Sequence, residues 1–294
     1  MTMPTATATN RTALVVQDAA PGASVQDLGR PGWATVGVPR GGAADRGSLR
    51  LANRLLGNPE SAAALEVTAG GCLARAEGTL WCAVTGADGP VLVEGREVGS
   101  AAAFPLPDGA RVEIGRPRRG LRSYLAVRGG FDVPRVLGSA SEDVLSAIVP
   151  TPVGAGVRLP VGSPAGPLPD TTFVPVAALP ELPRLRLHPG PRRDWVAASS
   201  LTMLTSVVYT VSAHSNRVGV RLTGPALTRA ITSELPSEGL LPGSVQVPPS
   251  GEPIIFLADV PTTGGYPVVA VVTETDLDVI GQLVPGQGVR LTWA

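Results

Sequence analysis

The sequence predicts a mainly β protein with many tight turns and a few short helices. The first observation is that 36 glycines and 30 prolines are spread between short apolar runs, as in chains with closely spaced turns. The second is that apolar residues alternate with a period of two in most runs from residue 65 onward. The third is that only residues 42–63 carry a clear helical pattern. Strands at this spacing form either a barrel or a sandwich.

The clear helix is expected to begin after Asp45 and to end near Leu56. Asp45 is a suitable N-cap residue, and Gly57 followed by Asn58 and Pro59 is a typical helix end. Apolar residues recur at helical spacing on one face: Leu49, Ala52, Leu55 and Leu56. Arginines four residues apart mark another face, which is either a solvated stripe or an edge facing an anion: Arg46, Arg50 and Arg54.

The remaining patterns divide the chain into two β domains. Residues 13–150 are expected to form the first domain and residues 184–294 the second, joined by a Pro/Gly-rich connection over 151–183. Turn pairs predict hairpins at Asp88-Gly89, Asp108-Gly109 and Ser250-Gly251. Residues 268–272 are apolar on both faces and predict a buried strand. A short helix is expected near Trp195–Leu204.

Composition excludes several kinds of chemistry. The formal net charge is zero and aromatic residues are few, so nucleic-acid binding has little support. All 24 basic residues are arginine, which excludes a Schiff-base lysine and a P-loop lysine on this chain.

No apolar run reaches the length of a membrane span. Residues 1–12 have no hydrophobic core region and are expected to be a disordered start, not a signal peptide. We therefore expect a cytoplasmic protein. Cys72 and Cys82 lie in apolar runs and are expected to be free, buried thiols.

Candidate sites fall on glycine-rich turns. The two histidines, His188 and His214, have no ligand partners at metal spacing, so no metal site is expected. Gly41 and Gly42 precede the helix, whose N-terminus would suit a phosphate or a carboxylate. Arg217 beside Gly219, and the stretch 262–265, offer a guanidinium and hydroxyls to an anion. Spacing alone does not select a proton-transfer residue among the acidic candidates, which are Asp27, Glu66, Asp88 and Asp259.

Several long motifs resemble the allophanate hydrolase subunit 2 family, which includes KipA, the C subunit of 5-oxoprolinase and the carboxyltransferase region of urea carboxylase. The matching stretches include "SVQDLGRPGW", "RSYLAVRGGFDVPRVLGS", "SNRVGVRLTGPAL" and "ADVPTTGGYP". The resemblance implies two linked β-barrel domains of cyclophilin-like topology. It also implies a smaller partner, a KipI-like protein or the B subunit of 5-oxoprolinase, and a further A subunit in the 5-oxoprolinase case.

The resemblance also carries site residues over to this sequence. Three are expected to be catalytic: Asp27, Arg217 and Asp259. The others are expected to bind a small amide substrate: Gln26, Arg30, Asp45, Arg46, Asn53, Asn216, Gln246, Thr262, Thr263, Gly264, Gly265 and Tyr266. Arg217 is expected to be an exposed turn residue, so that its replacement by alanine would stop turnover without unfolding the chain.

This sequence departs from the family pattern at three places. Ala140 and Glu142 stand in a segment that is usually Ser-Arg-Ser-Thr, so a positive charge is lost. Asn216 replaces the usual aspartate and removes a base. Glu238 and Leu240 stand where aspartate and valine are common.

Three functions remain open at this point. The first is a subunit of an ATP-dependent hydrolase that opens 5-oxo-L-proline to glutamate, with ATP bound by the assembled complex. The second is a carboxyltransferase subunit of a urea carboxylase system, with biotin carried on a partner. The third is a KipA-like antagonist of a kinase inhibitor, which the lost arginine and aspartate favour.

Overall fold

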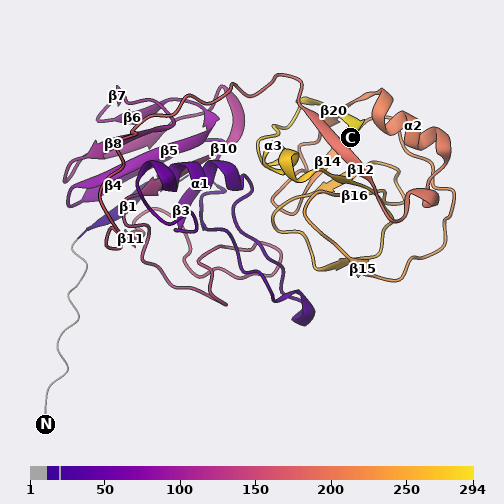
Figure 1. Cartoon of the computed structure of the whole chain (residues 1–294), viewed down its shortest axis with the longest axis horizontal. Helices are drawn as coiled ribbons and strands as arrows, with labels where there is room; N and C mark the ends of the chain where they lie inside the picture. Colours follow the sequence, from indigo (N-terminus) through magenta and orange to yellow (C-terminus); the bar gives the residue numbers. More distant parts are fainter. Residues whose placement is uncertain (1–11, 20) are drawn as a thin grey trace, which may run out of the picture.

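The computed structural model describes residues 12–19 and 21–294, and its strands gather into two β units that lie side by side in Figure 1. The mainly β fold class with a few short helices is confirmed. The cyclophilin-like topology of the units stays a prediction. The predicted disordered start, residues 1–12, lies outside the described residues except for Thr12. No helix in the described ranges is long and apolar enough to cross a bilayer.

The first unit consists of two sheets. The six-stranded sheet has the order β11-β1-β4-β9-β6-β7 and the five-stranded sheet has the order β2-β3-β10-β5-β8. The strands of the six-stranded sheet are β1 Ala13–Ala19, β4 Cys72–Glu77, β6 Val91–Val93, β7 Arg96–Glu97, β9 Arg111–Ile114 and β11 Arg158–Pro160. Those of the five-stranded sheet are β2 Ser24–Gln26, β3 Ala64–Thr68, β5 Leu80–Asp88, β8 Ala102–Leu106 and β10 Arg119–Val127.

One apolar core lies between these two sheets. Alternation along β4 buries Cys72, Ala74 and Ala76, while the residues between them are half-buried. Leu125 and Val127 of the five-stranded sheet belong to the same core. Cys72 and Cys82 are both buried and free, as predicted, and burial raises the pKa of the Cys82 thiol to about 12. These thiols are therefore unreactive packing groups.

Helix α1 (Arg46–Leu55) covers the outer face of the five-stranded sheet. Its predicted cap is confirmed, because the Ser48 N–H donates to Asp45 Oδ1 at 2.8 Å. Gly57 follows the helix with φ +67°, the left-handed conformation that favours glycine. The predicted apolar face packs on the sheet through Leu49, Ala52, Leu55 and Leu56.

Two of the three predicted hairpins are wrong. Asp88-Gly89 joins β5 to β6, and Asp108-Gly109 joins β8 to β9, and each pair of strands lies in different sheets. Turn residues fit both sites, but the chain crosses between sheets there, which local sequence does not reveal. The Ser250-Gly251 hairpin is confirmed, since β16 (Ser244–Gln246) and β17 (Ile254–Phe256) pair antiparallel.

The second unit is a closed barrel with the order β12-β19-β16-β17-β14-β13-β20. Its remaining strands are β12 Arg184–Pro189, β13 Val208–Val211, β14 Gly219–Thr223, β19 Val268–Val272 and β20 Gly288–Trp293. β15 (Glu238–Gly239) and β18 (Thr263–Gly264) form a separate pair. The helices are α2 (Ala198–Ser206), which was predicted, and α3 (Leu277–Gly281). The predicted buried strand is β19.

The connecting segment 151–183 lies against the first unit. Within it, β11 pairs with β1 at the edge of the six-stranded sheet. Farther along, the Ala103 N–H donates to the Thr172 carbonyl at 2.7 Å, and the Val174 N–H donates to the Ala101 carbonyl at 3.0 Å. The segment therefore covers one edge of each sheet before it reaches the barrel.

The N-terminus of α1 meets α3 at the junction of the two units. Asp278 accepts from the Arg46 N–H at 2.9 Å and from the Gly47 N–H at 3.1 Å. The Gln282 amide donates to Asp45 Oδ2 at 2.7 Å. At Gly281 a Cβ would lie 2.5 Å from the Ala44 carbonyl oxygen, so only glycine permits this approach. The helix N-terminus thus does hold an anion, but that anion is a carboxylate of the same chain.

Asp45 makes the junction sensitive to pH. Burial, and then the nearby Asp278, raises the pKa of Asp45 from 3.8 to about 6. A carboxyl with a raised pKa stabilises the fold fully below its unfolded pKa and loses that contribution as pH rises through the folded value.

We therefore expect the stability of the wild type relative to Asp45→Asn to increase by about 1 kcal/mol when the pH falls from about 7 to about 5. Asparagine retains a cap oxygen but does not titrate, so groups that do not interact with Asp45 cancel in the difference. Urea unfolding of both proteins at several pH values measures it. A difference that stays constant over this range would contradict the assignment.

Candidate functional site

The buried centre of the junction is an ionic network around Arg217, which precedes β14. Its guanidinium binds Asp259 through two hydrogen bonds of 3.0 and 3.1 Å. It also pairs with Glu66 of β3 and donates to the Gly42 carbonyl at 2.7 Å. Arg217 and Asp259 belong to the second unit and Glu66 to the first, and all three are buried. These ion pairs and hydrogen bonds therefore join the two units.

The expectation that Arg217 is exposed is wrong. The predicted turn is present, with Asn216 Oδ1 accepting from the N–H groups of Val218 and Gly219. The arginine side chain, however, points inward to Glu66, which is 151 residues away in the sequence. A contact over this separation leaves no local pattern.

Glu66 is held as a carboxylate. Burial would raise its pKa, but Arg217 and Arg122 together lower it below the ordinary value. Arg122 Nε lies 3.4 Å from Glu66 Oε1. The Ala44 N–H and the Tyr124 hydroxyl donate to Oε2 at 3.0 and 2.8 Å. Charge-assisted hydrogen bonds of this kind offset the cost of burying the charge.

Asp259 has a different electrostatic environment. Burial raises its pKa above the ordinary value, Arg217 offsets only part of that effect, and the nearby Asp143 adds to the rise. The Val144 N–H donates to its Oδ2 at 3.2 Å. Burial would lower the pKa of Arg217, but Glu66 and Asp259 raise it above the ordinary value. The arginine is thus always charged, and Asp259 is the more easily protonated of its two partners.

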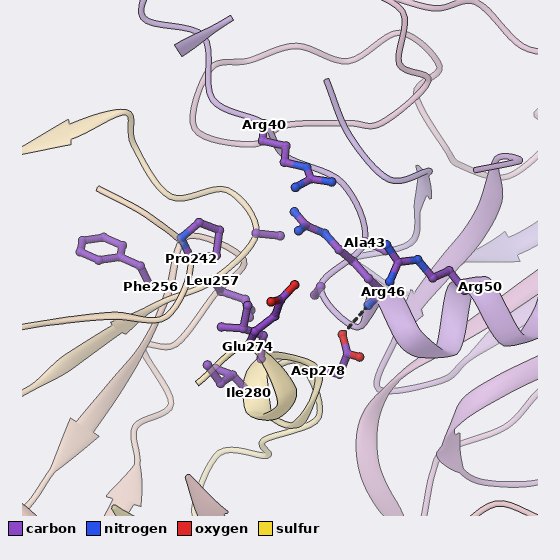
Figure 2. A pocket seen from close by; sticks show the side chains of 13 residues that line it. Arg40, Ala43, Arg46, Arg50, Pro242, Phe256, Leu257, Glu274, Asp278 and Ile280 are labelled. Carbon is purple, nitrogen blue, oxygen red and sulfur yellow. Dashed lines mark hydrogen bonds between the residues drawn. The ribbon is translucent and has the colours of Figure 1, made fainter. Parts of the chain in front are cut away.

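A cavity of about 250 Å³ opens between the units in front of α1, and we call it the arginine cleft. Arg40, Arg46 and Arg50 line it from the first unit. The second unit contributes apolar and acidic side chains: Pro242, Phe256, Leu257, Leu277, Ile280, Glu274 and Asp278. Figure 2 shows Arg40 and Arg46 extending toward each other, with Glu274 on the opposite wall. The cleft is therefore lined by three arginines and two carboxylates, with an apolar wall on the side of the second unit.

The ionic network lies directly behind the walls of the arginine cleft. Ala43 and Ala44 line the cleft, and Ala44 donates to Glu66. Ala258 also lines it, next to Asp259 in the chain. A displacement of the network would therefore move both walls.

A second cavity of about 410 Å³ adjoins the cleft and shares Arg40, Arg46 and Glu274 with it. Apolar residues dominate its lining, including Leu240, Leu241 and Val260. Thr262 is the member of the predicted 262–266 stretch that reaches this cavity. Within the described ranges, no three His, Cys, Asp or Glu side chains gather as a metal site would require.

Several predicted site residues lie away from the cleft and hold loops in place. Asp27 is buried and accepts from a set of donors that fix the segment 139–141: Ser139 Oγ, Ser141 Oγ and the Ala140 N–H. Arg30 is buried and donates to the Ser141 carbonyl. Gln26 donates to the Glu142 carbonyl at 3.1 Å. These three residues anchor one loop.

Other predicted residues also have structural contacts. Asn53 is buried and donates to the Ala62 carbonyl at 2.9 Å, closing the end of α1. The Gln246 amide donates to the Tyr266 carbonyl at 2.8 Å, and the Tyr266 side chain is exposed. Thr263 and Gly264 pair with β15, and Gly265 follows them at the surface. Asn216 lines a separate polar depression on the barrel.

The structure brings Asp45, Arg46, Arg217 and Asp259 together at the junction and places Thr262 beside it. Sequence reasoning missed Arg40, Arg122 and Asp278. The spacing of the arginines on α1 was the available signal. Arg46 and Arg50 line the cleft, whereas Arg54 pairs with Glu60 at the surface.

Comparison with known proteins shows several matches. Residues 36–293 match the family model described as carboxyltransferase domain, subdomain A and B. The chain is 38% identical to the C subunit of 5-oxoprolinase from Escherichia coli over 91% of this chain and 86% of that protein. It is 32% identical to urea amidolyase of Saccharomyces cerevisiae over 92% of this chain but only 16% of that protein. The crystal structure of TTHA0988 superposes with a TM-score of 0.89 at 37% identity, covering 97% of this chain and 56% of that one.

The ionic network leads to a stability prediction that reverses the expectation from sequence. Arg217→Ala leaves Glu66 and Asp259 buried without their shared cation, which costs about 3–5 kcal/mol in comparable networks. Urea denaturation should show that loss as a lower midpoint. The matched control is Arg221→Ala, because Arg221 lies four residues farther along, on β14, with an exposed side chain, and its replacement should change stability by less than about 0.5 kcal/mol. Equal midpoints for the two variants would show that the network is not stabilising.

Proposed function

The chain belongs to the carboxyltransferase-domain family of subdomains A and B, and from this membership we propose that it is the C-type subunit of a 5-oxoprolinase. The observation that supports this choice most strongly is the extent of the match. The chain aligns with 86% of the C subunit from Escherichia coli, a protein of similar length. The urea amidolyase match covers the same share of this chain but a small part of a much larger protein.

The proposed reaction is the ATP-dependent hydrolysis of 5-oxo-L-proline to glutamate, in which water supplies the atoms added to the opened amide and to the released phosphate. The substrate carries a carboxylate, and ATP and its products carry phosphates, so every small reactant other than water is an anion. The arginine cleft suits such reactants, because guanidinium groups bind carboxylates and phosphates with planar, directional hydrogen bonds. Arg217 and Asp259 act as positioning residues in this proposal, because they are buried behind the cleft wall.

Partners complete the proposed enzyme. A smaller KipI-like protein, which is the B subunit of a 5-oxoprolinase, and a further A subunit would join this chain. The sequence has no lysine, so ATP binding of the P-loop type would have to come from another subunit. ATP would then be bound by the assembled complex.

A carboxyltransferase function is the alternative that the urea amidolyase similarity favours. In that case the cleft would receive a carboxylated biotin and an amide such as urea. Biotin would have to be attached to a partner, because its attachment to protein needs a lysine and this chain has none.

The test is an activity assay of the complete assembly, co-expressed from one organism. We expect ATP-dependent release of glutamate from 5-oxo-L-proline only when all subunits are present. Arg46→Gln should lower kcat/KM at least about tenfold, because a charge-assisted hydrogen bond is worth about 1.5–3 kcal/mol. Arg96→Gln is the control, since Arg96 is exposed on β7, away from the cleft. Carboxylation of urea with a biotin carboxylase partner, and no glutamate release, would establish the alternative instead.

A further inference from the structure

The arginine cleft carries an excess of positive charge. Among the described residues, neither Arg40 nor Arg46 has a carboxylate within ion-pair distance, and Arg50 has only Glu60, at 3.5 Å. Glu60 is shared, because Arg54 lies 2.8 Å from it. Opposite them, Asp278 is occupied by the N–H groups at the start of α1. Only Glu274 remains as a lining carboxylate without a hydrogen-bond partner in the described part of the chain.

Most N–H donors of the Arg40 and Arg46 guanidinium groups have no hydrogen-bond partner in the described ranges. The only hydrogen bond of the Arg40 guanidinium within the described ranges goes to the Leu28 carbonyl at 3.3 Å. That of Arg46 goes to the Gly41 carbonyl, also at 3.3 Å. Each guanidinium has five N–H donors, so several on each side chain remain for a ligand. Burial lowers the pKa of Arg46 to about 10, and repulsion from Arg40 and Arg50 contributes, while the nearby Asp278 opposes the shift. An anion in the cleft would relieve this repulsion.

The choice of ligand can be inferred from the free donors of the cleft. Its lining holds three guanidiniums against two carboxylates, Glu274 and Asp278, so the number of unpartnered N–H donors, more than the net charge, distinguishes a carboxylate from a phosphoryl group. A phosphoryl group carries nearly two negative charges and three acceptor oxygens, which matches several convergent guanidiniums. The α1 N-terminus takes no part in the match, because Asp278 already occupies it.

We propose that Arg40 and Arg46, supported by Arg50, bind the phosphoryl group of a phosphate-bearing reactant on this chain. The inference rests on the proposed function for the origin of that phosphate, which would be the ATP-dependent step. The phosphate could belong to a nucleotide or to a phosphorylated reactant or product, and both present the same group to the cleft. The apolar wall formed by Leu257 and Ile280 would face the remainder of the molecule.

Isothermal titration calorimetry of the full chain at pH 8 and constant ionic strength tests this inference. The probes are inorganic phosphate, ADP and ATP, with acetate and 5-oxo-L-proline as ligands that carry only a carboxylate. We expect the phosphate-bearing probes to bind at least about tenfold more tightly than the carboxylates. Arg40→Gln and Arg46→Gln should each weaken phosphate binding about tenfold or more, the loss expected for a charge-assisted contact. Arg96→Gln should bind like the wild type.

Arg40 is exposed, so Arg40→Gln keeps the test valid even if a change at Arg46 disturbs folding. Tighter binding of ADP or ATP than of inorganic phosphate would identify a nucleotide as the source, and equal binding would identify a phosphorylated reactant or product. Equal or tighter binding of the carboxylates would overturn the inference. So would undetectable phosphate binding, or binding that both glutamine variants leave unchanged.

The calorimetry and the activity assay test the two hypotheses separately. Phosphate binding without glutamate release by the assembly would retain the phosphoryl-binding inference and reject the 5-oxoprolinase assignment. Glutamate release without phosphate binding to this chain would retain the 5-oxoprolinase assignment and reject the phosphoryl-binding inference.

Discussion

One buried guanidinium determines how the two β units of this protein meet. Arg217 leaves the barrel and ends between Glu66 of the first unit and Asp259 of the second. Burying three charges is costly, and the cost is recovered only when each hydrogen-bonding group finds its partner in good geometry. That requirement permits one relative placement of the units. The network therefore specifies the junction more strictly than apolar contact alone would.

The junction then determines the site. Ala44, whose N–H donates to Glu66, and Ala258, which precedes Asp259, both line the arginine cleft. On its other side, Asp278 of the second unit caps α1 of the first. The N-terminus of α1 is thus used to join the units. The side chains of Arg40, Arg46 and Arg50 line the cleft beside that contact.

Local physical chemistry predicts much of this fold. The cap at Asp45, the apolar face of α1 and the buried strand β19 all have short-range signals, and the structure has each of them. The resemblance to the family that includes the C subunit of 5-oxoprolinase is also confirmed. Hairpins at Asp88-Gly89 and Asp108-Gly109 were predicted wrongly, because a turn sequence does not show which sheet the next strand will join.

The environments of the site residues were harder to predict than the secondary structure, for a related reason. Arg217 looked like a surface turn residue, and Asp27 looked like an acid available for chemistry. Their environments come from residues far away in the chain: Glu66 for the first, and Ser139 and Ser141 for the second. Burial and partner choice over such separations depend on the tertiary structure. Part of the cleft was indicated in advance by the four-residue spacing of Arg46 and Arg50, by the glycines before the helix and by the family resemblance at Arg46.

Gly281, at the end of α3, lies where the two units approach each other too closely for a side chain. The Ala44 carbonyl approaches its Cα so closely that even a methyl group would collide with backbone, and backbone yields less readily than a flexible side chain. A residue with no chemical function of its own therefore sets the spacing between the halves of the molecule. A side chain at this position would displace Ala44, whose N–H donates to Glu66, and would therefore disturb the walls of the cleft together with the ionic network.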